Sequence, residues 1–173
     1  MKILLIGPQG SGKSTQGKLL AKHLKVPIIS TGDIFRQTAS INEIIRTILD
    51  QGRLVNDLTT SQLVEKRLGE KDCKGGFVLD GYPRNIPQVT IFDPKFDKIF
   101  YLNVPEEVLM DRLIKRGRED DTPEGIKTRL ELYYKQTQPL LDYYKRLGKL
   151  VEVDGSGAVT EIQQKIRDFV NGK

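Results

Sequence analysis

Residues 7–15, GPQGSGKST, follow the apolar run ILLI at residues 3–6 and precede the helix-like stretch QGKLLAKHL at residues 16–24. They match the pattern G-x-x-x-x-G-K-[ST] through Gly7, Gly12, Lys13 and Ser14. A buried strand that runs into a glycine-rich turn and then into a helix brings backbone N–H groups and the positive helix end to one point. The sequence therefore predicts a loop that binds a phosphate chain.

The residue types of this loop suit that chemistry. We expect Gly10 and Gly12 to let the backbone wrap closely where a Cβ would collide. Lys13 adds a point charge that reaches the outer phosphates, and the hydroxyls of Ser14 and Thr15 are expected near a bound magnesium ion. A chance glycine turn is the alternative, and the strand before the loop and the helix after it favour the phosphate site.

The composition is that of one globular domain of 173 residues, in which 38% are apolar and no apolar run approaches membrane-spanning length. We therefore expect a soluble, cytoplasmic protein. The single cysteine, Cys73, excludes an internal disulfide or a cysteine-rich zinc site, and its charged neighbours predict a surface loop. The single histidine, His23, has no metal-ligand spacing around it, so we assign it no role.

The net charge is +5, from 28 Lys and Arg against 23 Asp and Glu. Such a charge fits either a nucleic-acid surface or a site for small polyanions. No basic run with interleaved aromatic residues is found, and the arginines fall at points that the expected structure brings near the phosphate loop. The small-polyanion interpretation is therefore preferred.

The hydrophobic pattern predicts an α/β fold. Strands are expected at residues 3–6, 26–30, 76–80, 98–103 and 150–153. Between them the pattern indicates two helices in residues 34–51 after a cap at Asp33, and further helices at 57–68, 105–116, 123–136, 139–147 and 159–170. Alternating strands and helices predict a parallel sheet that is covered on both faces and binds ligands at the carboxyl ends of its strands.

Four polar residues stand out against this fold. Asp80 ends a buried strand and is suited to hold magnesium or its waters, although a turn-forming Asp-Gly pair is an alternative. Arg112 and Arg116 share one helix face, where compensation of the helix dipole is the alternative to ligand binding. Arg129 lies beside the apolar stripe of its helix and should lean toward the protein body.

Nearly the whole chain resembles the nucleoside monophosphate kinases, and within them the adenylate kinases. The motifs occur in the family's order: GPQGSGKST, STGDIFR, GRLV with Asp57, GFVLDGYPRNIPQ, DRLIKRG, and RxDD followed by KTRLELYYKQTQPL. The resemblance implies the P-loop kinase fold, with a five-stranded parallel sheet, a small helical NMP-binding region at residues 30–56 and a very short lid at residues 115–121. It also implies reversible transfer of the terminal phosphoryl group of MgATP to AMP, which gives two ADP.

The resemblance also implies the residues of the site. It assigns ATP binding to Gly10, Ser11, Gly12, Lys13, Ser14, Thr15, Arg112, Arg116 and Gly157. It assigns AMP binding to Thr31, Arg36, Arg53, Leu54, Val55, Gly81, Tyr82, Pro83, Arg84, Gln88, Arg118 and Arg129. The catalytic group would be Lys13, Arg84, Arg116, Arg118 and Arg129, and Asp80 would reach Mg²⁺ through water. The implied partners are ATP, AMP and ADP. From the residues themselves we expect a monomeric chain, no structural zinc, no nucleic acid and no membrane.

Three alternatives stay open. A UMP or CMP kinase of the same fold is favoured by Asn85 and opposed by Gln88 and Thr31, which suit an adenine edge. A non-catalytic ATP-dependent switch is opposed by the second pair of anion-binding arginines, Arg36 and Arg84. A nucleic-acid-binding role is the weakest, because the arginines of the expected site account for the net charge.

Overall fold

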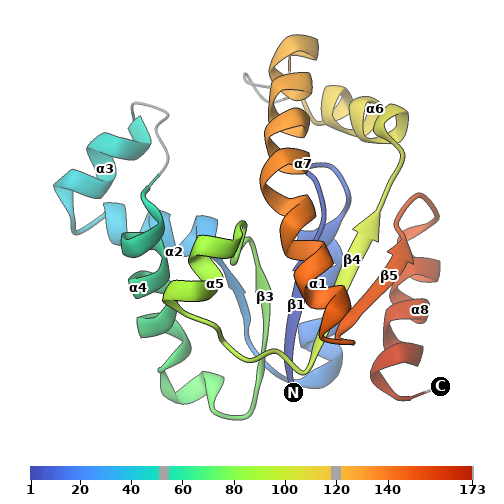
Figure 1. Cartoon of the computed structure of the whole chain (residues 1–173), viewed down its shortest axis with the longest axis horizontal. Helices are drawn as coiled ribbons and strands as arrows, with labels where there is room; N and C mark the ends of the chain where they lie inside the picture. The colour runs from blue at the N-terminus through green and yellow to red at the C-terminus, as the bar shows by residue number, and fades with distance from the viewer. Residues whose placement is uncertain (51–54, 118–121, 173) are drawn as a thin grey trace.

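Five parallel strands form the centre of the molecule (Figure 1). The computed structural model describes residues 1–50, 55–117 and 122–172. The strands are β1 (Lys2–Ile6), β2 (Ile28–Ser30), β3 (Phe77–Asp80), β4 (Lys98–Asn103) and β5 (Leu150–Asp154). Their order in the sheet is β2-β3-β1-β4-β5, and every neighbouring pair is parallel. The predicted sheet is confirmed, with strand ends that differ from the expected ones by one or two residues.

The helices cover both faces of this sheet. They are α1 (Lys13–Leu24), α2 (Thr31–Ala39), α3 (Glu43–Asp50), α4 (Asp57–Leu68), α5 (Ile86–Ile91), α6 (Glu106–Arg116), α7 (Pro123–Arg146) and α8 (Val159–Val170). A 3₁₀ turn, η1, spans Lys71–Cys73. Helices α1 and α8 lie against one face, and α4, α5 and α7 lie against the other (Figure 1).

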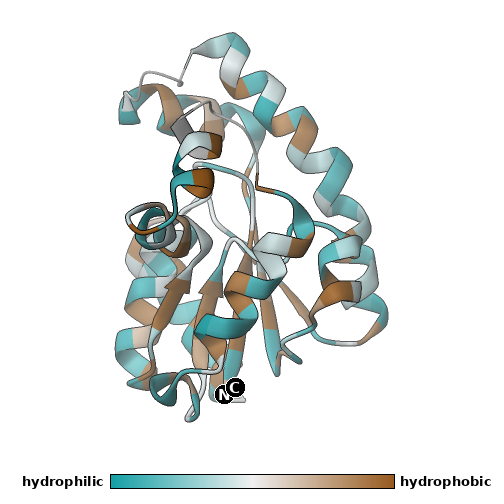
Figure 2. Cartoon of the chain, turned by 90° about the vertical axis from the view of Figure 1, so that its left-hand side faces the viewer, coloured by the Kyte–Doolittle hydropathy of each residue, from teal (hydrophilic) through white to brown (hydrophobic). Residues whose placement is uncertain are grey.

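Alternation along the central strand explains the two layers. On β1, Ile3 and Leu5 join the cluster under α1 and α8, whereas Leu4 and Ile6 join the cluster under α4, α5 and α7. All four side chains are buried, so the strand after Lys2 is a continuous apolar run, as a strand of a doubly covered parallel sheet should be. Figure 2 shows the same contrast, since the strands are brown and the helices that cover them carry teal outer faces.

Local signals fix several helix ends. Gly117 adopts a left-handed conformation (φ 65°) and ends α6, as predicted. The Thr122 side chain accepts a hydrogen bond from the Gly125 N–H and caps α7, also as predicted. By contrast, α2 already begins at Thr31, so Asp33 lies inside its first turn and the prediction of a cap at Asp33 is wrong.

Two further predictions are corrected by the structure. Helix α7 runs through Pro139 without a break, whereas the sequence predicted a restart there. Cys73 is not on the surface, because its thiol points into the core beneath η1 and the residue is only 3% exposed. Helix α5 was not predicted from the sequence, although Asn85 caps it and Pro87 lies in its first turn.

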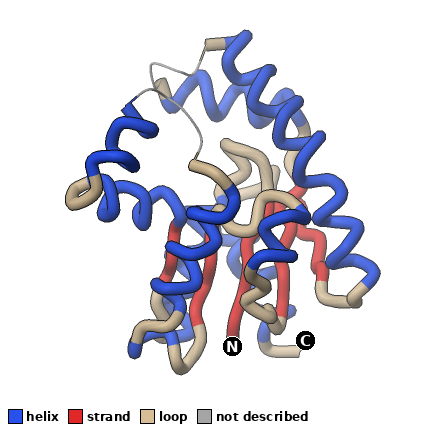
Figure 3. The backbone as a smooth tube through the Cα atoms, turned by 60° about the vertical axis from the view of Figure 1, so that its left-hand side comes forward, coloured by secondary structure: helices blue, strands red, loops and turns tan. Residues whose placement is uncertain are grey.

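The carboxyl ends of the strands all meet at one edge of the sheet, where the loop after β1 lies. Helices α2 and α3 project beyond this edge on one side, and α6 with the start of α7 projects on the other (Figures 1 and 3). A third apolar cluster, with Leu109, Leu113, Ile126 and Leu130 at its centre, joins α6 to α7. No helix in the described part of the chain is long and apolar enough to cross a membrane.

Candidate functional site

The loop between β1 and α1 has the geometry of a phosphate cradle. Gly10 (φ 84°) and Gly12 (φ 91°) both have left-handed backbones, which most side chains avoid. A Cβ at Gly10 would lie 3.0 Å from the Leu113 side chain, a tight contact that Leu113 would have to relieve by a small shift. At Gly12 a Cβ would meet no described protein atom within 4 Å, so within the protein it is the left-handed conformation that favours glycine there.

Lys13 is half-buried at the start of α1, and its Nζ donates a hydrogen bond of 2.8 Å to the Pro8 carbonyl of the same loop. Burial lowers the pKa of Lys13 to about 8. The nearby Asp80 carboxylate opposes this shift, whereas the positive charges of Arg84 and Arg116 add to it. Lys13 therefore lies near two other cations and one carboxylate, and a bound anion would add to the stabilisation of its charged form.

Asp80 connects β3 to the phosphate loop. It is 6% exposed, and its Oδ2 accepts a 2.7 Å hydrogen bond from the Ser14 hydroxyl. A hydroxyl and a carboxylate side by side at a phosphate loop fit a magnesium ion that keeps most of its waters and takes one or two protein ligands. Within the described ranges no three His, Cys, Asp or Glu side chains gather as a metal cage, so the phosphates would have to complete such a coordination shell.

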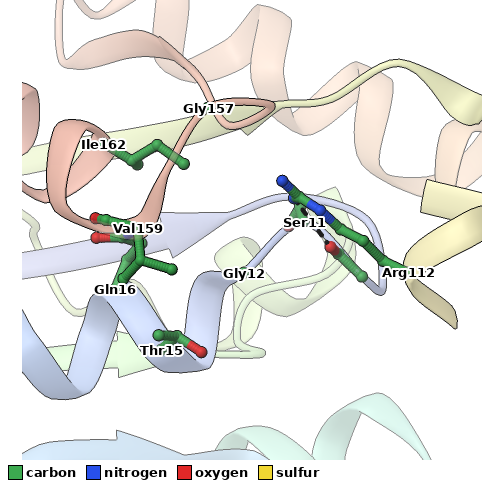
Figure 4. Close-up of a pocket in the computed structure, with 9 residues that line it drawn as sticks. Ser11, Gly12, Thr15, Gln16, Arg112, Gly157, Val159 and Ile162 are labelled. Carbon is green, nitrogen blue, oxygen red and sulfur yellow. Dashed lines mark hydrogen bonds between the residues drawn. The ribbon is translucent and has the colours of Figure 1, made fainter. Parts of the chain in front are cut away.

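A pocket of about 190 Å³ extends from the loop toward the β5–α8 turn (Figure 4). Six residues that the sequence assigned to ATP line it: Gly10, Ser11, Gly12, Thr15, Arg112 and Gly157. The Arg112 guanidinium reaches over the loop and donates hydrogen bonds to the carbonyls of Gly155 (2.9 Å) and Ser156 (3.1 Å), with a longer one to Gly10 (3.4 Å). Arg112 therefore joins the two walls of the pocket.

The other wall contains residues that the sequence analysis missed, namely Gln16, Val159 and Ile162. Gln16 is buried, and its Nε2 donates a 3.0 Å hydrogen bond to the Val159 carbonyl at the start of α8. No local pattern pointed to these residues, because the contact between Gln16 and Val159 joins parts of the chain that are 143 residues apart.

The residues assigned to AMP lie on the other side of Asp80. The Thr31 hydroxyl and the Arg84 Nε both donate to the Gly81 carbonyl, at 3.3 and 2.9 Å. Thr31 is 2% exposed, whereas Arg36 is exposed and pairs with Asp33 in its own helix. The structure thus brings Thr31, Gly81 and Arg84 together.

Gln88 lies at the base of this second region and is 5% exposed. Its Oε1 accepts a 2.7 Å hydrogen bond from the Arg84 N–H, and its Nε2 donates a 2.7 Å hydrogen bond to Asp57 Oδ1. Tyr82 is fully buried, and its hydroxyl lies within hydrogen-bond distance of the Gln88 carbonyl (2.8 Å) and the Phe92 carbonyl (2.7 Å). Burial raises the pKa of Tyr82 to about 12, so its side chain is a neutral support beneath the site.

Some of the remaining predicted residues lie in the part of the chain that the structure describes, and others do not. Arg53, Leu54 and Arg118 lie outside the described residues, as does most of the expected lid. Arg129 lies on α7 and donates to the Gly125 carbonyl at 3.1 Å. Val55 is half-buried just before α4, and Pro83 is buried after Tyr82.

Comparison with known proteins agrees with this geometry. Residues 5–149 match the family model described as adenylate kinase. The chain belongs to the adenylate kinase family. It is 45% identical to an adenylate kinase of Bifidobacterium longum, over 96% of this chain and 97% of the relative. It is 39% identical to an adenylate kinase of Cyanothece sp., over 98% and 95% of the two chains, and 38% identical to that of Clavibacter michiganensis, over 99% and 94%. The predicted family and fold are therefore confirmed.

Proposed function

We propose that the protein uses the two regions on either side of Asp80 as its donor and acceptor sites. As a member of the adenylate kinase family, it is a nucleoside monophosphate kinase that converts ATP and AMP into two ADP. The phosphate loop with the pocket under Arg112 would bind ATP, and the region around Thr31, Arg84 and Gln88 would bind AMP.

One observation carries this assignment. Asp80 accepts a hydrogen bond from Ser14 of the phosphate loop, and the carbonyl of the next residue, Gly81, accepts from both Thr31 and Arg84. Two consecutive residues at the end of β3 therefore touch the donor loop and the acceptor arginine. A phosphoryl group held by Lys13 would have only a short path to a phosphate held by Arg84.

The chemistry needs positioning and charge neutralisation more than it needs acid or base groups, because the acceptor is already an ionised phosphate. Lys13, Arg84 and Arg116 are close enough for their charges to act on one another, and we assign them to the migrating phosphoryl group. Arg118 and Arg129 join this group in the proposal, and Arg36 assists Arg84 with the AMP phosphate. Mg²⁺ bound near Ser14 and Asp80 would neutralise charge on the ATP phosphates.

The internal division of the chain is part of the proposal. We assign residues 30–56 to the NMP-binding region and residues 115–121 to a shortened lid. The alignments with relatives from Clostridium kluyveri and Caldanaerobacter subterraneus extend over 209 and 214 positions, so those relatives contain segments that this chain of 173 residues lacks. This difference supports a reduced lid. Cytoplasmic location, the monomeric state and the absence of zinc stay predictions.

Initial rates with ATP and a panel of AMP, CMP, UMP, GMP and dTMP test the proposal. AMP should exceed each pyrimidine nucleotide in kcat/KM by more than about tenfold, roughly 1.4 kcal/mol. Equal use of UMP or CMP would overturn the assignment of Gln88 and Thr31 to an adenine. ATP hydrolysis that does not depend on any acceptor would favour a nucleotide-dependent switch.

A further inference from the structure

The Gln88 side chain is held from both ends. Its carbonyl oxygen faces a backbone donor, the Arg84 N–H at 2.7 Å, and its amide nitrogen faces a carboxylate, Asp57 Oδ1 at 2.7 Å. An N–H can only donate and a carboxylate can only accept. Exchanging the oxygen and nitrogen of Gln88 would therefore place two donors together at one end and two acceptors together at the other.

Asp57 is itself held in place. The Asn85 Nδ2 donates to both of its carboxylate oxygens, at 3.2 and 3.1 Å, and the Asn85 Oδ1 accepts from the Gln88 N–H at 2.9 Å as the cap of α5. The three side chains thus connect the start of α4 to the start of α5. Gln88 and Asp57 lie 31 residues apart in the sequence, so only the fold brings them together.

We propose that Asp57 is a specificity-determining positioning residue, which fixes the amide of Gln88 in one orientation so that the acceptor site reads a 6-amino purine and rejects a 6-oxo purine. This inference rests on the proposed function, in which Gln88 faces the base of the acceptor nucleotide. Asp57 touches no substrate in this account and acts through Gln88.

The chemistry of the base edge gives the reason. Beyond its two protein partners, the Gln88 amide retains one N–H and one carbonyl lone pair for a ligand. Adenine presents a ring acceptor at N1 beside an amino donor at N6, whereas hypoxanthine and guanine present a donor at N1 beside an acceptor at O6. A freely rotating amide could match either edge by turning over. A fixed amide matches only one, and the other base leaves buried polar groups unpaired.

AMP and IMP are the matched pair of acceptors for the test, because they differ only at this edge. The measured quantity is the ratio of kcat/KM for AMP to kcat/KM for IMP. Asp57→Asn keeps the shape of the side chain but can accept or donate, and Asp57→Ala removes the partner altogether. We expect each variant to lower the ratio by about tenfold or more through the KM values, with kcat for AMP within about threefold of the wild type.

Two further variants separate positioning from folding. Glu65→Gln removes the same charge from an exposed position of the same helix and should leave the ratio unchanged. Asn85→Ser keeps a side-chain oxygen for the helix cap but removes the donor to Asp57, and it should lower the ratio in the same direction by less. Thermal unfolding of each variant, measured in parallel, confirms that the rates come from folded protein.

Gln88→Ala distinguishes failure of this inference from failure of the proposed function. If Gln88→Ala lowers the ratio and neither Asp57 variant changes it by more than about twofold, base recognition stands and the role of Asp57 is overturned. A fall in kcat for AMP and IMP alike, at a constant ratio, would also overturn it and assign Asp57 a purely structural role. If Gln88→Ala leaves the ratio unchanged, Gln88 does not read the base, and both proposals fail at this position.

Discussion

The two halves of the site differ in how their polar groups are engaged. In the ATP half, Arg112 connects the phosphate loop to the β5–α8 turn and a pocket already stands beneath it. In the AMP half, the groups assigned to the ligand bond to the protein itself, since Thr31 and Arg84 donate to Gly81 and Gln88 bonds to Asp57. Groups of the ATP half also bond to the protein, since Lys13 donates to Pro8 and Ser14 donates to Asp80, but this half already contains a pocket of about 190 Å³.

This difference predicts different costs of binding. ATP would enter a pocket whose walls Arg112 already joins, and Lys13 would exchange its hydrogen bond to the Pro8 carbonyl for bonds to the phosphates. AMP would have to replace internal hydrogen bonds of Arg84 and Thr31 with bonds to its own phosphate and base, which lowers the net gain per contact. Lys13 lies between the halves, beside Asp80, Arg84 and Arg116.

The largest effect is expected for Lys13→Met, which removes the cation shared by both halves. We expect kcat to fall at least about a hundredfold, roughly 2.7 kcal/mol, because a preorganised charge at the reaction centre is lost. The circular dichroism spectrum should be unchanged, since Lys13 contributes no core packing. A variant that keeps more than about a tenth of the wild-type kcat would exclude Lys13 from the mechanism.

Arg84→Ala tests the AMP half, because Arg84 would reach both the AMP phosphate and the migrating phosphoryl group from that side. The guanidinium would contribute charged hydrogen bonds to the AMP phosphate, worth about 1.5–3 kcal/mol, so kcat/KM for AMP should fall by about 10- to 100-fold. The Kd for ATP, measured by calorimetry without AMP, should change little. Arg84→Lys is the matched control, because it keeps the charge and loses the forked geometry. Equal losses of ATP and AMP binding would show that the halves are not separable at this residue.

The pH dependence of ATP binding tests the ATP half. Burial lowers the pKa of Lys13 to about 8 in the free protein, and bound phosphate should raise it again. ATP affinity should therefore be level below pH 8 and weaken by up to about tenfold per pH unit above it, because binding then requires uptake of a proton. Lys13→Arg should remove this slope. A wild-type affinity that does not change between pH 7 and pH 9 would contradict the assignment.

The same shift has an opposite consequence for the stability of the free protein. The unfolded chain holds its Lys13 proton to a higher pH than the folded chain does, so this residue makes the free energy of unfolding rise with pH above about 8. The difference in the free energy of unfolding between the wild type and Lys13→Met, measured from pH 7 to pH 9.5, isolates this contribution. If the free energy of unfolding of the wild type fell relative to that of Lys13→Met as the pH rises, the lowered pKa of Lys13 would be contradicted.

The smallest effect is expected for Asn56→Ala, which touches the AMP half only through a helix end. Asn56 Oδ1 accepts a 2.8 Å hydrogen bond from the Thr59 N–H and caps α4, the helix that carries Asp57. Loss of this cap should cost about 1 kcal/mol of unfolding free energy, which denaturant titration measures. ATP affinity should be unaffected, and a weakened ATP site would show that α4 also supports the donor half.

Local patterns were sufficient to predict the phosphate loop of the ATP half, whereas Arg112, Arg116 and Gly157 were assigned to it through the family resemblance. The strand, the loop pattern and the helix after it are consecutive, so Gly10 to Thr15 could be assigned directly. The sequence could not show that Asp57 bonds to Gln88 or that Gln16 supports Val159, since these pairs join distant parts of the chain. The AMP half depends on such contacts and was therefore predicted chiefly through family resemblance.

Two predictions, for Pro139 and Cys73, were wrong for the same physical reason. In both places the burial of apolar side chains outweighed the preference that the local sequence indicates. Pro139 costs α7 one backbone hydrogen bond, yet Leu140, Leu141 and Tyr144 just after it are buried and hold the helix in line. Cys73 has charged neighbours that point to solvent from a tight 3₁₀ turn, while its own side chain joins the core. Side-chain direction within a turn cannot be read from composition.

A reciprocal pair of variants tests the division of the site most directly. For Arg112→Ala and Gln88→Ala, the Kd for ATP is measured by calorimetry and the KM for AMP by initial rates at saturating ATP. We predict that Arg112→Ala weakens ATP binding by about tenfold or more and leaves the KM for AMP within about threefold, and that Gln88→Ala does the reverse. If each variant changes both constants to the same extent, or if Gln88→Ala weakens ATP instead of AMP, the account of two separate halves is contradicted.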